Sequence, residues 1–163
     1  KFTFMKTEGP ELKGWCQEKN HLNWIEVGSW NFSVSNDSDP TKGAGGTKGV
    51  AHLSEFSFIK EGAKTVPSTT NVLTQGGHID KVTFHAERTG QKSEDKHRYM
   101  EMVFYNCTLS GDSPDNSEPN APHSLSFSFT KFEMRYMELK KEGMAGAPSS
   151  MMFDAAEKKW SRS

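Results

Sequence analysis

The sequence of 163 residues is long enough for one domain with its own core, and we expect residues 1–163 to form a single domain. Lys and Arg number 20 against 21 Asp and Glu, so the chain lacks the overall basic field that attracts nucleic acid. Hydrophobic residues make up only 33% of the sequence. The longest apolar runs fall far short of the roughly 20 residues that a membrane-spanning helix needs, which excludes a membrane protein with such a helix.

The N-terminal residues contain no apolar stretch followed by a small-residue cleavage site. We therefore expect synthesis in the cytoplasm, and export by a route that needs no signal peptide stays open. Cys16 and Cys107 are too few for a disulfide framework, so we expect two reduced thiols.

The first strands are predicted from the alternation of apolar and polar side chains. Residues 2–6 alternate as a short strand does, and the pattern resumes at residue 23 after a connection with glycine and proline. Gly28 is typical of a bulge or of a close backbone approach. Trp30 and Phe32 then share a face, so residues 23–35 form one long strand or two strands joined by a kink.

A long polar segment follows. Residues 36–49 contain no large apolar side chain, and their glycines, among them Gly43, Gly45 and Gly46, increase the backbone freedom of the unfolded chain. Connections in compact domains mostly run about 4–6 residues. The segment is therefore either a flexible surface loop or a loop that becomes ordered by contact with a molecule outside its own fold.

Strand character returns over residues 50–59, and residues 66–77 form the one convincing helix of the sequence. Val72 gives this helix an inward side, and Gly76 can cap its end. Strands then dominate the second half. Residues 99–109 carry apolar side chains on both faces, which indicates a strand that is covered on both sides.

The C-terminal part completes the predicted fold. Residues 110–122 are acidic and proline-bearing and form a second long loop. Over residues 123–139 the apolar set of 125–129 shifts phase by one residue, as at a β-bulge that bends a strand in a closing barrel. A last strand is expected within 151–160. These elements predict a mostly-β fold, a compact closed β-barrel of two packed sheets with one flanking α-helix and long extended loops.

The motifs of catalytic and metal sites are incomplete in this sequence. His85 and Glu87 match the H-x-E of zinc deaminases, but the paired cysteines of that signature are missing. The histidines show none of the spacings of structural zinc sites. The glycine-rich residues 43–48 lack the residue order of a phosphate-binding loop. We expect no catalytic residues, no metal, no cofactor and no enzymatic activity.

The order of these features resembles the Hcp family, the tube-forming proteins of bacterial type VI secretion systems. The matching stretches cover most of the chain. They are residues 4–10, 24–32, the glycine-rich 43–49, 53–60, the helix with 76–79, 99–104 and 125–133. The acidic loop at 110–122 and the pair Trp15 and Cys16 depart from the family pattern, and loops at such positions alter ring stacking or the choice of effector.

The resemblance implies a secreted virulence protein that works by assembly. Its copies would form a homo-hexameric ring, and stacked rings would make a hollow tube that is expelled with the spike protein VgrG by a contractile sheath. The lumen would carry or chaperone small effector proteins. The protein would leave the bacterial cytoplasm for the exterior or a target cell without a signal peptide. Neither nucleic acid nor membrane insertion is implied.

The expected subunit interface combines the polar loop with two aromatic residues that precede it. It consists of Trp30, Phe32, Lys42, Gly43, Gly45, Gly46 and Lys48. A neighbouring subunit would also cover the strand that is apolar on both faces; alternatively, Met100, Met102 and Phe104 lie under the helix. Lumen-facing residues cannot be chosen, because the sequence does not show which face of each strand looks inward.

Two functions from other classes compete with this one. A monomeric β-barrel that binds a small apolar ligand would hold a cavity lined by Phe84, Phe127 and Phe129, whereas a tube subunit would have these residues in a filled core. A hydrolase on a β-sandwich would need converging carboxylates, and the sequence spacing does not locate them.

Overall fold

A computed structural model describes residues 3–37, 50–60, 66–89, 96–114, 122–139, 145–154 and 159–162. These residues form eleven strands and one helix. In chain order they are β1 (Thr3–Glu8), β2 (Ile25–Asn31), β3 (Val34–Asp37), β4 (Val50–Leu53), β5 (Phe56–Lys60), α1 (Val66–Thr74), β6 (His78–Thr89), β7 (Lys96–Pro114), β8 (His123–Ser128), β9 (Lys131–Leu139), β10 (Ala145–Asp154) and β11 (Lys159–Arg162).

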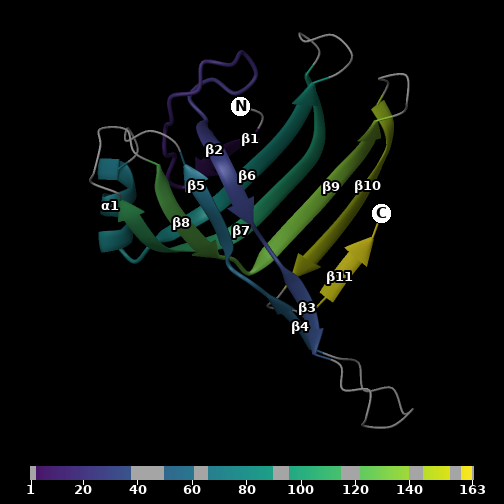
Figure 1. Ribbon diagram of the computed structural model, residues 1–163. Helices are drawn as coiled ribbons and strands as arrows, with labels where there is room; N and C mark the ends of the chain where they lie inside the picture. The colour runs from purple at the N-terminus through teal and green to yellow at the C-terminus, as the bar shows by residue number, and fades with distance from the viewer. Residues whose placement is uncertain are drawn as a thin grey trace.

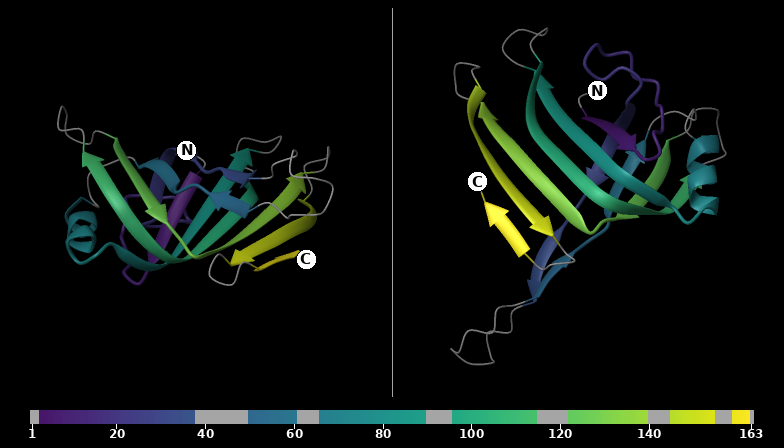
Figure 2. Two further views of the ribbon diagram at one scale, coloured as in Figure 1. Left: turned by 90° about the horizontal axis from the view of Figure 1, so that it is seen from below. Right: turned by 180° about the vertical axis from the view of Figure 1, so that it is seen from behind.

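Six strands close into a barrel. They follow the order β7, β6, β1, β2, β5 and β8, and β8 returns to pair with the second half of β7. The first half of β7 pairs with β9, which continues into β10 and β11, so a three-stranded extension leaves the barrel wall (Figure 1 and Figure 2). The predicted closed barrel with one short helix is confirmed, and its wall is one continuous sheet.

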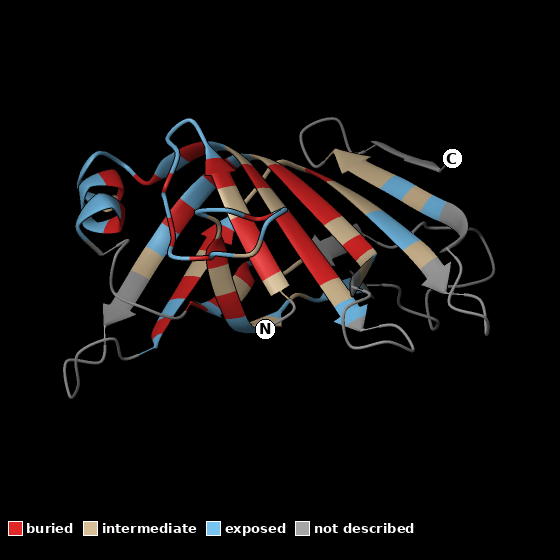
Figure 3. Ribbon diagram, turned by 90° about the horizontal axis from the view of Figure 1, so that it is seen from above, coloured by how far each residue is buried: buried red, intermediate tan, exposed pale blue. Residues whose placement is uncertain are grey.

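Aromatic side chains fill the barrel. Phe56 on β5 and Phe84 on β6 belong to strands that are not neighbours, yet their ring centroids lie 5.3 Å apart across the interior. Phe104 and Phe127, 5.2 Å apart, complete this centre, and all four side chains are buried. Buried residues gather on the barrel strands, whereas the strands near the C-terminus are mostly intermediate or exposed (Figure 3).

Strand β7 changes the face it turns inward, which explains why its sequence is apolar on both sides. Met102 and Phe104 point into the barrel, and Cys107 and Leu109 do so after a change of phase at Asn106, which has φ 52°. A residue in the left-handed region interrupts the alternation of a strand. The core of the same chain thus covers Met102 and Phe104, whereas Val103 and Tyr105 lie on the other face of β7. That a neighbouring subunit covers this other face stays a prediction.

The same irregularity separates β8 from β9. Thr130 lies between these strands, and its N–H donates to the carbonyl of Tyr105, one residue before Asn106, at 3.2 Å. The phase slip predicted within 123–139 is therefore confirmed as a bend. Before the bend the chain closes the barrel as β8, and after it the chain leaves the barrel as β9.

Several predicted boundaries need correction. Residues 23–35 contain two strands, β2 and β3, as one of the two interpretations expected, whereas residues 50–59, expected as one strand, contain β4 and β5, because the chain leaves the barrel wall after β2 and returns to it at β5. The bulge expected at Gly28 is confirmed by a register shift between Val27 and Ser29. The loop predicted from residue 110 begins later, because β7 pairs with β8 as far as Pro114. The expected last strand is two strands, β10 and β11.

Helix α1 ends in a glycine pair. The N–H of Gly77 donates to the carbonyl of Val72 at 2.8 Å, and that of Gly76 donates to the carbonyl of Leu73 at 3.2 Å, the pattern of a Schellman cap. Both glycines have positive φ, 101° at Gly76 and 78° at Gly77. The predicted cap at Gly76 is confirmed. None of the helical segments in the described ranges is long and apolar enough to cross a membrane.

Candidate functional site

Strands β3 and β4 form a two-stranded ribbon that projects from the barrel (Figure 1 and Figure 2). Val34 pairs with Leu53 at its base and Asp37 with Val50 at its far end. The base is fastened where the Ser54 N–H donates to the carbonyl of Ser33 at 2.9 Å. Val34 is 56% exposed although it is apolar. A two-stranded ribbon is only marginally stable alone, so this element is suited to packing against a second molecule.

The two aromatic residues of the expected interface anchor the root of the ribbon. Trp30 stacks on Phe56 with ring centroids 5.8 Å apart, and Phe32 lies 5.5 Å from Phe132. Both side chains are half-buried and pack against the core of their own barrel. Only part of each is therefore left for contact with a neighbour, and their interface role stays a prediction.

The remaining residues of the expected interface lie outside the described residues. They are Lys42, Gly43, Gly45, Gly46 and Lys48, which follow β3 and precede β4. Their role in assembly also stays a prediction.

The extension β9–β11 is a second candidate contact surface, and the sequence reasoning did not assign it. Tyr136 on β9 is 42% exposed and Met151 on β10 is 37% exposed. A shallow pocket of about 270 Å³ lies along β7, β9 and β10, with Val103 and Met152 in its lining. The apolar alternation through Tyr136 was the available signal, but it did not show that this part of the sheet lies beyond the closed barrel.

The barrel interior leaves little room for a ligand. Phe84 and Phe127 are fully buried in the core, and Phe129 packs against it. The internal cavity beside Phe127 measures about 20 Å³, roughly the space of one water molecule. The arrangement matches the filled core that was expected of a tube subunit and does not favour a barrel that holds a small apolar ligand.

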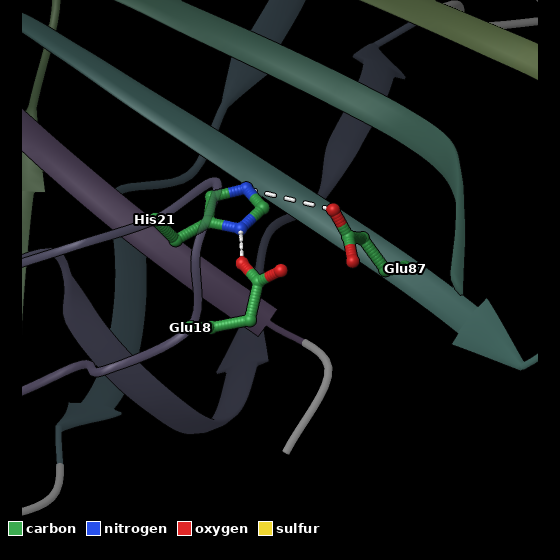
Figure 4. Close-up of side chains that lie close together, drawn as sticks. All are labelled: Glu18, His21 and Glu87. Carbon is green, nitrogen blue, oxygen red and sulfur yellow. Dashed lines mark hydrogen bonds and ion pairs between the residues drawn. The ribbon is translucent and has the colours of Figure 1, made fainter. Parts of the chain in front are cut away.

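A buried polar cluster lies on the outer face of the barrel, under the connection between β1 and β2. His21 from this connection is 2% exposed and stacks on Phe4 at 4.1 Å between centroids, with Trp24 at its edge. Its Nδ1 binds the carboxylate of Glu18, and its Nε2 lies 3.5 Å from Oε1 of Glu87 on β6 (Figure 4). The two carboxylates thus occupy opposite nitrogens of one ring.

His85 joins this cluster from β6. Its Nδ1 lies 3.0 Å from Nε2 of His21, and its Nε2 lies 2.6 Å from Oε2 of Glu101. Nη1 of Arg98 is 3.1 Å from Nε2 of the same ring. Burial lowers the pKa of His85 to about 4, assisted by the positive charge of Arg98 and opposed by the hydrogen bond to Glu101. His85 lies on the outer face of β6, and it is buried there because the connection between β1 and β2 covers it.

Both cysteines are buried and free, as expected. Burial raises the pKa of Cys107 to about 12 and also raises that of Cys16. Because the thiolate is the reactive form, neither thiol is activated for chemistry in the folded chain.

Comparison with known proteins identifies one family. The family model described as "Type VI secretion system effector, Hcp" matches residues 4–136. A search of curated proteins by sequence finds no match.

Solved structures share the fold at low sequence identity. A structure described as a type six secretion system protein is 17% identical, with a TM-score of 0.84 over 99% of this chain and 100% of that chain. Hcp1 from Salmonella typhimurium is 18% identical, with a TM-score of 0.76 over 98% of both chains. A type VI secretion system effector from Yersinia pestis is 23% identical, with a TM-score of 0.69 over 93% of this chain and 98% of that chain.

Proposed function

Because the chain belongs to the Hcp family of type VI secretion system proteins, we propose that residues 1–163 form a single-domain tube subunit. Copies of the chain close into hexameric rings, and the rings stack into a hollow tube. The role is structural rather than enzymatic. The tube is expelled with the spike protein VgrG by the contractile sheath, so the subunit passes from the bacterial cytoplasm to the exterior or a target cell.

The projecting ribbon β3–β4 is the observation that carries this proposal. It extends beyond the barrel, and it presents the apolar side chain of Val34 to solvent. Partner contact would supply the packing that a two-stranded ribbon cannot supply for itself. Five residues of the expected interface follow β3 and precede β4, namely Lys42, Gly43, Gly45, Gly46 and Lys48, and the other two, Trp30 and Phe32, lie at the root of the ribbon.

Ring closure needs a contact between two different surfaces whose rotation closes after a whole number of copies. The extension β9–β11 provides one such surface, because it carries partly exposed apolar residues beyond the closed barrel, among them Tyr136 and Met151. We assign the extension β9–β11, at the side of the subunit, to the contact that closes the ring. We assign the ribbon β3–β4 to the contact between stacked rings. Small effector proteins bind in the lumen of the ring.

The test replaces two glycines of the expected interface, Gly45→Val and Gly46→Val together. Assembly should weaken while the circular dichroism spectrum and the urea midpoint of the dissociated subunit stay unchanged. The matched control is Gly111→Val, because a Cβ at Gly111 would meet no atom within 4 Å. Size-exclusion chromatography with light scattering gives the mass of each variant. An unchanged ring mass and unchanged tube formation in the double variant would contradict the assignment of this loop.

A further inference from the structure

A chain of side-chain hydrogen bonds with two histidines holds the connection between β1 and β2, residues 9–24, on the barrel wall. On the connection, Nδ1 of His21 contacts the carboxylate of Glu18 (Figure 4). Nε2 of His21 lies 3.0 Å from Nδ1 of His85 on β6. Nε2 of His85 in turn lies 2.6 Å from Oε2 of Glu101 on β7. The chain therefore runs from one carboxylate through two imidazoles to a second carboxylate.

These contacts fix how many hydrogens the two rings carry. A hydrogen bond needs one donor and one acceptor, and an ionised carboxylate only accepts. Nδ1 of His21 and Nε2 of His85 must therefore each carry a hydrogen, and a third hydrogen must lie between the two facing nitrogens. In the described residues no buried polar side-chain atom lacks a partner, in agreement with this count. Three hydrogens on four nitrogens make one imidazolium and one neutral imidazole.

A fourth hydrogen does not fit this closed arrangement. It would set two N–H groups against each other across 3.0 Å and leave both rings positively charged. The guanidinium of Arg98 adds to the repulsion, because its Nη1 lies 3.1 Å from Nε2 of His85. Burial lowers the pKa of His85 to about 4, and the charges of Arg98 and His21 act in the same direction, against the hydrogen bond to Glu101.

The other charged groups around the two histidines are carboxylates. Oε1 of Glu87 on β6 lies 3.5 Å from Nε2 of His21. Glu18 has a further partner besides His21. On β2, Glu26 pairs across the strands with Phe4, which separates it from the histidines. Carboxyl groups ordinarily titrate near pH 4, so histidine is the side chain whose charge changes between pH 7 and 5.

We propose that His21 and His85 form a pH-sensitive latch, which holds the connection on the barrel wall near neutral pH and releases it in mild acid. Lifting the connection moves both rings into water, where each binds its own proton below about pH 6.5. The closed form takes up the second proton only near pH 4, so the stability of the closed latch is lost as the pH falls from 6.5 towards 4. Release uncovers Phe4, which is 1% exposed beneath the ring of His21, so the barrel wall gains an apolar surface in acid. The latch works within one chain and does not depend on assembly.

Hydrogen exchange of the full, tag-free chain tests the latch, measured by mass spectrometry at several pH values from 7 to 5. The reporters are amides that bond within the connection, those of Gly14, Cys16 and Asn23. Their protection factors, corrected for the pH dependence of exchange in an unstructured chain, should fall roughly eightfold between pH 6.5 and 5, since the open form then holds two protons and the closed form one. Protection of β6 and β7 should stay constant. Constant protection of the connection, or an equal fall in β6 and β7, would overturn the proposal.

Variants identify the titrating group. His85→Gln and His85→Phe both remove one of the two rings, and either should abolish the fall in protection between pH 6.5 and 5. Two replacements are used so that one folded variant suffices, and far-ultraviolet circular dichroism checks folding. The control is His78→Gln, which removes an exposed histidine of β6 paired with Asp80 at 2.6 Å and should keep the full effect. A fall that persists in a folded His85 variant, or disappears in His78→Gln, would show that another group senses the pH.

Discussion

Replacing Val34 with serine tests whether the ribbon makes contacts between subunits. Val34 is 56% exposed in the single chain, so the change should alter the stability of the subunit by less than about 1 kcal/mol. Full burial of a valine side chain is worth roughly 1.5–3 kcal/mol. Burying the exposed half at a contact is then worth about 1 kcal/mol. A hexameric ring repeats the contact at each subunit, which gives roughly 6 kcal/mol per pair of rings, or about ten-thousand-fold in stacking affinity.

Urea unfolding of the dissociated subunit measures its stability, and sedimentation with negative-stain microscopy measures tube formation as a function of concentration. Leu22→Ser is the matched control, because Leu22 is exposed to nearly the same extent, 57%, but lies on the connection rather than on the ribbon. We expect tubes to fail in Val34→Ser and to persist in Leu22→Ser. Equal tube formation by Val34→Ser and the unchanged protein would refute the reasoning, as would equal losses in both variants.

Further predictions concern the barrel itself. Phe104→Ala should lower the free energy of unfolding by about 3–5 kcal/mol, measured with urea, because it empties the centre of the core; a loss under 1 kcal/mol would contradict the packing described. Gly77→Ala should destabilise more than Gly76→Ala, since both have positive φ but only a Cβ at Gly77 would lie 2.4 Å from the carbonyl oxygen of Leu109; equal urea midpoints would count against this. At pH 8 neither cysteine should react with a maleimide until urea unfolds the chain, and fast native labelling would disprove their burial. The folded pKa of Cys107, about 12, exceeds its ordinary value of 9.0, so the unfolded chain releases this proton first. The contribution of Cys107 to stability should therefore fall as the pH rises from 9 towards 12, and Cys107→Ala should show a weaker fall in its urea midpoint.

Local patterns in the sequence predicted the features that depend on near neighbours. The cap at Gly76 follows from the positive φ that glycine adopts easily, and the bulge at Gly28 follows from the weakening of a strand by a residue without a side chain. The inward positions of Phe56 and Phe84 follow from strand alternation. Residues 99–109 carry apolar side chains on both faces of the strand, and the alternation alone could not show that the strand changes its inward face. That change depends on the positive φ of Asn106, which the sequence does not signal because Asn106 is not a glycine.

The buried cluster and the extension β9–β11 depend on contacts between distant parts of the chain. His21 and His85 are 64 residues apart, and no spacing rule for metal ligands within one helix or strand joins them. Only the fold of the connection over β6 brings them together. In the same way, the pattern through Tyr136 indicates a strand, but the branching of the sheet at β7 decides that this strand lies beyond the barrel.

Self-assembly is the central claim, and negative-stain electron microscopy of the purified, tag-free chain tests it most directly. Annular particles viewed end-on, with a light-scattering mass close to that of a hexamer, are the predicted result. A homogeneous population of monomers that persists to high micromolar concentration would contradict the claim.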